Sequence, residues 1–194
     1  MSELTSKVNT LIRSRRAVFP KMYNGTPITD QEIRDILENA NWAPTHKKTE
    51  PWRFVVFHGE GLTTLSEWMA QKYKKQAEQK GDFSEVRYQK FQQKPLQCNY
   101  VLGICLHRDP EERLPEWEEI AALACAVQNM WLTCAAFGIG CYWSTPSFVV
   151  DSPDFPAMQE GWQCKGLFYM GRWDVQELPA VRTPVEDKLV WVNS

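Results

Sequence analysis

The chain has 194 residues, of which 43% are hydrophobic and 24% are charged. This size and composition are typical of a globular domain that buries a sizeable core without disulfides, so we expect one domain over residues 1–194. The formal net charge of −2 argues against nucleic acid or an anionic membrane as a partner, because no overall positive field would attract either.

The cysteines and the N-terminal residues bear on the compartment. Six cysteines are present, and no two of them have the C-x-x-C spacing of a zinc or thioredoxin-type site, so we expect free buried thiols. The first residues are polar and lack the apolar core of a signal peptide. No apolar run approaches the ~20 residues that cross a bilayer. Together these features favour a cytoplasmic protein.

The N-terminal part of the chain predicts two helices. An apolar stripe indicates an amphipathic helix over residues 6–16. Thr29 and Glu32 have the spacing of a capping box, in which each side chain bonds the other residue's backbone amide, and they predict the start of a second helix. This helix should end near Trp42, because Pro44 disfavours helical backbone in the residue before it.

The rest of the chain predicts strands alternating with helices. Strands are expected at residues 53–58, 99–107, 141–147 and 163–173, and helices at 62–80 and 116–140. Residues 81–97 are polar and less regular, and a second helix is the alternative for this segment. The last helix is apolar almost all round after Ile120, so we expect it at the centre of the fold. The apolar tail, residues 180–192, should be buried, partly against a partner subunit. The pattern is that of an α+β or α/β domain with a small sheet.

Several familiar site motifs are absent from the sequence. It contains no G-x-G-x-x-G, no Walker A loop, no H-E-x-x-H and no G-x-S-x-G. The three histidines, His46, His58 and His107, are scattered. A nucleotide site of the usual kinds, a hydrolase triad and a metal site are therefore disfavoured.

Two basic segments stand out as candidate sites. Arg15 and Arg16 follow the first helix, and arginine suits phosphate because its fork donates two charged hydrogen bonds. Their alternative role is that of solvated arginines at the negative end of a helix. The second segment is "WAPTHKKTEPW", residues 42–52, where prolines fix the ends of a loop that contains His46 and two tryptophans can pack at its base. Its alternative is a solvated surface loop.

A third candidate follows the long helix. Trp143 precedes the hydroxyl residues Ser144 and Thr145, and the alternative is an aromatic strand that ends in a turn. Taken together, the three segments suit an anionic, planar ligand: arginines for phosphate, polar groups for ring edges and aromatic side chains for a flat face.

The order of these segments resembles the nitroreductase family of flavin mononucleotide (FMN) proteins. The matching segments are "RSRRAVF", "ITDQEIRDILENANWAPTHKKTEPWRFVVF", "GIGCYWSTP" and "GLFYMGRW". The chain is most similar to the short bacterial subgroup called minimal nitroreductases. The resemblance implies an α+β nitroreductase-like fold, with a small mixed sheet packed by helices around a long central helix. It also implies an intertwined homodimer that binds FMN at two sites along its interface.

The resemblance also assigns roles to residues at matching positions. Arg15, Arg16 and Ala17 would bind the phosphate and ribityl chain of FMN, with Ala17 offering only its backbone where relatives have serine. His46 would reach the flavin from the partner subunit. Trp42 stands where relatives often have an arginine. The remaining cofactor-binding positions are Trp143, Ser144, Thr145 and Arg182.

The implied activity is ping-pong hydride transfer from NAD(P)H through FMN to a nitroaromatic, a quinone or a similar acceptor. His46, Lys47 and Lys48 are candidates to stabilise the negative charge of reduced flavin. No catalytic side chain and no metal ligand are assigned. Two alternatives remain: a flavin-binding protein with little turnover, such as a redox sensor or FMN store, and a helical interaction protein without a cofactor.

Overall fold

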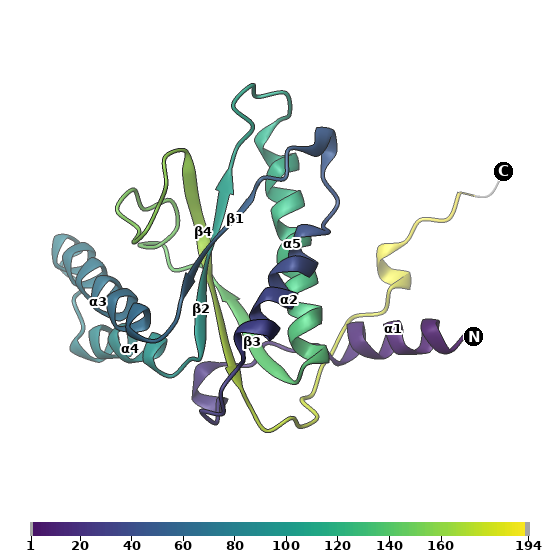
Figure 1. Ribbon diagram of the computed structural model, residues 1–194, viewed down its shortest axis with the longest axis horizontal. Helices are drawn as coiled ribbons and strands as arrows, with labels where there is room; N and C mark the ends of the chain where they lie inside the picture. Colours follow the sequence, from purple (N-terminus) through teal and green to yellow (C-terminus); the bar gives the residue numbers. More distant parts are fainter. Residues whose placement is uncertain (1, 193–194) are drawn as a thin grey trace.

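The computed structural model describes residues 2–192 and has three layers (Figure 1). A four-stranded sheet lies in the middle, with α3 and α4 on one face and α2 and α5 on the other. The helices are α1 (Glu3–Ser14), α2 (Asp30–Asn41), α3 (Glu60–Lys80), α4 (Glu85–Leu96) and α5 (Glu116–Ala136), with short 3-10 helices η1 (Pro20–Met22), η2 (His46–Lys48) and η3 (Glu186–Lys188). The strands are β1 (Trp52–Phe57), β2 (Tyr100–His107), β3 (Ile139–Ser144) and β4 (Trp162–Arg172).

The sheet has the strand order β1-β2-β4-β3. All three pairings are antiparallel, so the mixed sheet that the resemblance implied is not present among residues 2–192. β2 and β3 both pair antiparallel with β4 and therefore run parallel to each other, so a crossover must join them, and α5 supplies it. The predicted α+β class is confirmed, and each predicted strand is present to within a few residues.

The core consists of two clusters, one on each face of the sheet, because successive side chains along a strand point to opposite faces. Along β2, Leu102, Ile104 and Leu106 face α2 and α5, and Val101 and Cys105 face α3. Both sets are fully buried, as expected for a sheet that is covered on two faces.

The second helix begins where the sequence predicted. The Thr29 hydroxyl accepts from the Glu32 amide at 3.2 Å, and the Thr29 amide donates to the Glu32 carboxylate at 2.9 Å. Ile33, Ile36 and Ala40 then face the core. The capping box thus sets the phase of α2 so that its apolar stripe packs on α5.

Helix α4 is the second helix that was the alternative for the polar segment 81–97. The Ser84 side chain accepts from the Arg87 amide and begins the helix, which continues through Pro95 to Leu96. Its sequence has only a weak apolar stripe, because α4 is mostly exposed and packs chiefly on α3.

Helix α5 is less central than expected. Among residues 2–192 it is the one helix whose length and composition would allow it to cross a membrane. Only 39% of its most apolar 18-residue stretch is buried. One side packs on the sheet and on α2, while the other side leaves Trp117 and Ile120 exposed. The exposed side of α5 is therefore more apolar than a helix side that faces only solvent.

The two ends of the chain share this unburied character. Helix α1 projects from the body with no buried residue, and the C-terminal segment runs outward beside it (Figure 1). In the tail, Val190 is 90% exposed and Trp191 is 78% exposed, so the predicted burial is absent within a single chain.

A short segment after α1 lies across the end of the sheet. The Val18 amide donates to the Cys141 carbonyl at 3.0 Å, and the Tyr23 hydroxyl donates to the Tyr169 carbonyl at 3.1 Å. The Tyr23 ring fills the space above Gly171, where any Cβ would collide with it. This close approach fixes the height of residues 18–23 over β3 and β4.

Candidate functional site

The first hollow lies between the end of α1, the second half of α5 and the segment after β4. We call it the arginine hollow; its volume is about 710 Å³. It is lined by Ser6, Asn9, Thr10, Arg13, Ser14, Arg15, Arg16, Val18, Trp131, Ala135, Gly138, Ile139, Cys141, Trp173, Val175, Gln176, Glu177 and Leu178. Three arginines and one carboxylate line it, so it favours an anion.

Arg15 and Arg16 both line this hollow, as the sequence suggested for a shared site. The Arg15 guanidinium lies 4.5 Å from the centre of the Trp131 ring, and partial burial and the charge of Arg182 lower its pKa. Arg16 donates to the Leu178 carbonyl at 2.9 Å and to the Arg13 carbonyl at 2.6 Å. Arg16 therefore fastens the C-terminal segment to α1, while Arg15 presents its charge to the hollow.

The second hollow lies between α4 and η1. We call it the lysine hollow; its volume is about 670 Å³. It is lined by Phe19, Pro20, Lys21, Val86, Gln89, Lys90, Gln93, Lys94, Gln97 and Tyr142. It has three cations and no carboxylate, and its two aromatic side chains, Phe19 and Tyr142, contact each other with ring centres 4.9 Å apart.

Lys94 is the cation that this hollow holds closest to aromatic rings. Its ammonium lies 5.0 Å from the centre of the Tyr142 ring and 4.6 Å from that of Tyr169. The two rings are stacked with centres 5.2 Å apart. Burial, together with the charge of Lys90, lowers the pKa of Lys94 to about 8. A lysine in this setting is a candidate partner for negative charge that develops on a bound ligand.

The hydroxyl of Tyr142 is buried and has no hydrogen-bond partner among the described residues. Burial raises the pKa of this phenol against a smaller, opposing effect of the nearby Ser144 side chain, so the group stays a neutral donor. An unpaired polar atom beside a hollow is costly unless a ligand satisfies it. Sequence reasoning missed Lys94 and Tyr142; strand alternation, which places Tyr142 and Trp143 on opposite faces, could have found the second.

Residues 15–21 connect the two hollows. Arg15 and Arg16 line the first hollow and Phe19 lines the second. Ala17 is exposed between them. The Trp131 indole donates to the Arg16 carbonyl at 3.0 Å and holds this crossing segment against α5. One extended ligand could therefore contact both hollows along this segment.

The hydroxyl pair after Trp143 lies at the end of β3. Trp143 is half-buried and packs toward the cluster under α2 and α5, opposite to Tyr142. Its indole nitrogen is buried and has no partner among residues 2–192. Ser144 ends the strand and Thr145 is exposed after it, and neither lines a hollow described above.

Only one of the two tryptophans of the loop 42–52 anchors it. Trp52 is 5% exposed and donates to the Asn41 side chain at 3.1 Å. Trp42 is 78% exposed, so the prediction that it packs at the base of the loop is wrong for a single chain. Its indole reaches back to Glu38 at 2.9 Å instead, because α2 ends with this residue on the solvent side.

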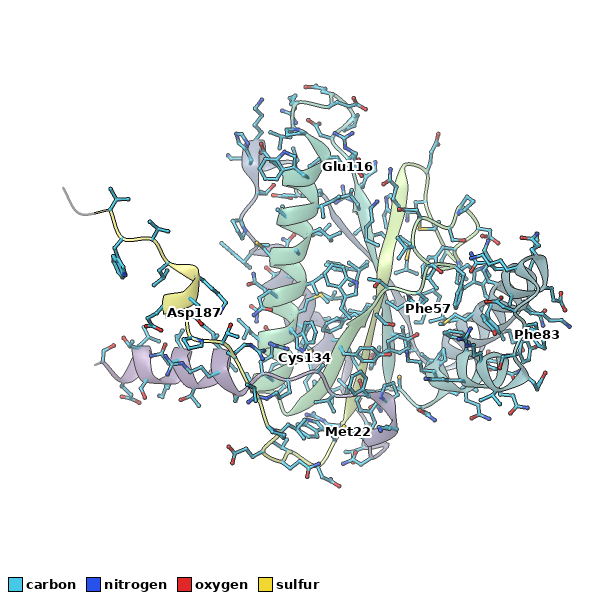
Figure 2. The ribbon with its side chains drawn as sticks, turned by 180° about the vertical axis from the view of Figure 1, so that it is seen from behind. Met22, Phe57, Phe83, Glu116, Cys134 and Asp187 are labelled. Atoms are coloured by element: carbon cyan, nitrogen blue, oxygen red, sulfur yellow. The ribbon has the colours of Figure 1, made fainter. Side chains whose placement is uncertain are left out.

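His46 lies far from both hollows of its own chain. Its loop lies beside the first turns of α5, at the opposite end of that helix from α1 (Figure 1). Figure 2 marks these two ends by Glu116 and Cys134. The His46 ring nitrogen Nδ1 is 2.7 Å from the Glu118 carboxylate. Within one chain, Trp42 and His46 are not brought together with the arginines.

Arg182 belongs to the exposed tail and does not line the arginine hollow, but it lies near enough to Arg15 to act on its charge. Its charge is one of the causes that lower the pKa of Arg15. Within residues 2–192, no group of three or more histidine, cysteine or acidic side chains is placed to hold a metal ion. All six cysteines are free, and five of them are buried.

The fold and these hollows define a nitroreductase-like α+β protein. A nitroreductase-like family protein from Bacillus cereus matches it with a TM-score of 0.79, at 22% identity over 96% of each chain. A nitroreductase from Bacteroides fragilis NCTC 9343, solved with bound FMN, matches with a TM-score of 0.71, at 19% identity over 100% of each chain.

Sequence comparison gives the family itself. The family model for nitroreductases matches residues 12–172, so the chain belongs to the nitroreductase family. The Bacillus subtilis (strain 168) protein YfhC, provisionally named as an NAD(P)H nitroreductase, is 30% identical over 188 residues, which cover 94% of this chain and 93% of that relative. The family resemblance stated from the sequence segments is confirmed.

Proposed function

We propose that the protein is an FMN-dependent NAD(P)H oxidoreductase that passes a hydride to a nitroaromatic, a quinone or a similar acceptor. The observation that carries the proposal is the segment 15–21, which connects two cation-lined hollows of about 710 and 670 Å³. Pockets for cofactors and small ligands have volumes of about 300–1,000 Å³. The FMN of the Bacteroides fragilis structure and the NAD(P)H in the name of YfhC support the choice of cofactor and donor.

The residues present fit a phosphorylated flavin. Arg15 and Arg182 would hold the phosphate, because their two positive charges repel each other and an anion between them would relieve that repulsion. The Ala17 backbone would lie along the ribityl chain. The unpaired Tyr142 hydroxyl and Lys94 would meet the ring system, with the flat face of the flavin against aromatic side chains.

The chain is proposed to act as a homodimer. Its unburied apolar surface comprises one side of α5, the stripe of α1 and the C-terminal tail, and a second copy of this chain would cover all three. The second copy would also supply Trp42 and His46, which lie away from the hollows of their own chain. Each site would then contain residues of both subunits.

The flavin supplies the hydride chemistry when bound, and the protein supplies binding and charge. Lys94, with His46 and Lys47 from the partner, would offset the negative charge of the reduced ring. A pKa of about 8 keeps the Lys94 ammonium charged at neutral pH. No side chain is assigned as a general acid or base. We also infer a cytoplasmic location, where NAD(P)H is available.

The test begins with the absorbance spectrum of the purified protein. Bound flavin should colour it yellow, and addition of a quinone should cause rapid NADH or NADPH oxidation. Parallel lines in double-reciprocal plots would establish the ping-pong order. A yellow protein without turnover would support the flavin-binding alternative, and a colourless one that takes up no added FMN would contradict the proposal.

A further inference from the structure

A contact between two distant segments orients the His46 ring. Its Nδ1 lies 2.7 Å from Oε2 of Glu118, which belongs to the first turns of α5. The Glu118 side chain is 25% exposed, whereas that of His46 is 60% exposed. The carboxylate is thus the sheltered member of the pair, and the imidazole is the member presented outward.

The chemistry of the two groups decides which ring nitrogen is presented. An ionised carboxylate only accepts hydrogen bonds, so Nδ1 must donate and carry the proton. In the neutral imidazole this leaves Nε2 as an acceptor, and in the protonated ring Nε2 becomes a donor. In both states Nε2 is the atom that faces away from Glu118.

The backbone around His46 is held in a costly conformation. Lys47, Lys48 and Glu50 have φ values of 51°, 55° and 43°, in the left-handed region that favours glycine. Such strain persists only where surrounding contacts impose it. Here the Glu50 amide donates to the Thr45 hydroxyl at 3.1 Å. The loop is therefore built to one shape.

The other charged groups near the pair are committed elsewhere. Glu119 is fully buried and accepts from Arg108 at 3.0 Å. Glu116 lies 3.7 Å from Lys165. From the preceding loop, the Arg113 guanidinium is held by Asp109 at 2.6 Å.

Lys47, which follows His46 in the chain, also fastens the loop. The Lys47 ammonium donates to the Arg113 carbonyl at 3.2 Å. Of the three acidic residues in the first turn of α5, Glu118 is thus the one that faces the imidazole.

We propose that Glu118 is a positioning residue, which holds His46 in the Nδ1–H tautomer and presents Nε2 to the flavin site of the partner subunit. This inference rests on the proposed function for the identity of that site. Without the carboxylate, the ring would rotate and exchange tautomers, so Nε2 would be misplaced at the moment when charge develops on the ligand. Groups that orient metal-bound histidines contribute a factor of about 10–100 to affinity or activity, and we expect an effect at the lower end of this range for a histidine that binds no metal.

The direct test is the tautomer of His46 in the full-length protein. Histidine-selective ¹⁵N NMR resolves few signals, since the chain has three histidines, and a His46→Gln variant assigns the relevant one. At about pH 9, where imidazoles are neutral, the wild type should show Nδ1–H. Glu118→Ala should shift the signal toward Nε2–H. A wild-type spectrum of the Nε2–H form would overturn the proposal.

Kinetics provide a second readout. Glu118→Ala should lower kcat for quinone reduction about 10-fold, with the KM for NAD(P)H changed less than about twofold. Glu118→Gln keeps an acceptor and should recover part of the loss. The matched control is Glu116→Gln, two residues away on the same turn, which should leave tautomer and kcat unchanged.

The outcomes separate this inference from the proposed function. An active wild type whose Glu118→Ala and Glu118→Gln variants keep the wild-type tautomer and kcat would refute the role of Glu118 alone. A wild type that binds no flavin would refute the proposed function, while the tautomer measurement would still stand or fail by itself. Thermal unfolding of both variants shows whether a loss of kcat reflects a loss of fold.

Discussion

Helices α3 and α5 have the same length, but the exposed side of α3 is polar and that of α5 is largely apolar. Each has 21 residues, and in each the structure buries seven of them. The exposed side of α3 consists largely of lysine, glutamine and glutamate, whereas that of α5 includes Trp117, Ile120 and Ala124. Burial within one chain therefore does not distinguish them; the chemistry of the remaining surface does.

The two faces of the sheet therefore differ in their outer surfaces: the α3 side is mainly polar, and the α5 side exposes apolar residues. On the α3 side, α4 packs alongside and the polar surface meets solvent. On the α5 side, α1 and the tail expose apolar residues, and the arginine hollow opens beside them. The hollow proposed for the phosphate thus lies on the α5 side, whereas the hollow proposed for the flavin ring is lined by α4.

The largest expected change in the free energy of unfolding comes from a core variant on the α3 side. Leu65 in α3 is fully buried, so Leu65→Ala should lower the free energy of unfolding by about 3–5 kcal/mol through lost transfer and a residual cavity. Urea titration would measure it. The loss should be similar at every protein concentration, because no subunit contact is involved; a strong concentration dependence would erase the contrast with α5.

A charge on the exposed side of α5 should act on association. Ala124→Asp would place an uncompensated carboxylate in the proposed interface and weaken dimerisation by about 3 kcal/mol, or about 100-fold. Analytical ultracentrifugation would follow it. The control is Lys75→Asp on the exposed side of α3, expected to change stability by less than about 0.5 kcal/mol. Equal effects of both variants would mean that the two sides do not differ.

Arg15, which lines the arginine hollow on the α5 side, should determine how tightly FMN is retained. Arg15→Ala should weaken FMN binding by about 1.5–3 kcal/mol for each charged hydrogen bond that is lost. Flavin fluorescence after dilution measures the release. Lys21→Ala, which removes an exposed cation of the other hollow, is the comparison. Unchanged FMN occupancy in Arg15→Ala would remove this residue from the site.

The smallest effect concerns pH and the half-buried Lys94. Its folded pKa of about 8 lies below the ordinary value of 10.5, so between these values the unfolded chain binds the proton that the folded chain has released. Lys94 therefore destabilises the fold below about pH 8, and this penalty disappears as the pH rises toward 10.5.

The variant Lys94→Met isolates this contribution. The free energy of unfolding of the wild type should rise relative to that of the variant between about pH 8 and 10.5. The comparison uses the difference between the two proteins because burial also raises the pKa of Cys98 to about 12. That shift lowers the free energy of unfolding as the pH rises, and it is present in both proteins. A constant difference across that range would contradict the buried position of Lys94.

Much of the fold follows from local patterns in the sequence. The capping box at Thr29 and the apolar stripe of α2 are both present, because each depends on residues three or four apart. The strands were found from β-branched and aromatic runs, but their order was not, because pairing joins residues far apart in the chain.

The site was predictable only in part. Arg15 and Arg16 share a hollow as expected, since they are neighbours beside one helix end. Lys94 was missed because it lies on a polar helix whose contact with Tyr142 depends on the packing of α4 against η1. Trp42 was misplaced because residue type alone favoured burial, whereas the phase of α2 turns it outward.

The glycine beneath Tyr23 has a consequence for how this site tolerates mutation. Gly171 touches no proposed ligand, yet a single methyl group there would collide with the Tyr23 ring and lift the segment that begins at Arg15. Variation at this position should therefore be as damaging to flavin binding as variation at the arginines themselves. The geometry of the proposed cofactor site thus depends on a residue that has no side chain and lines neither hollow.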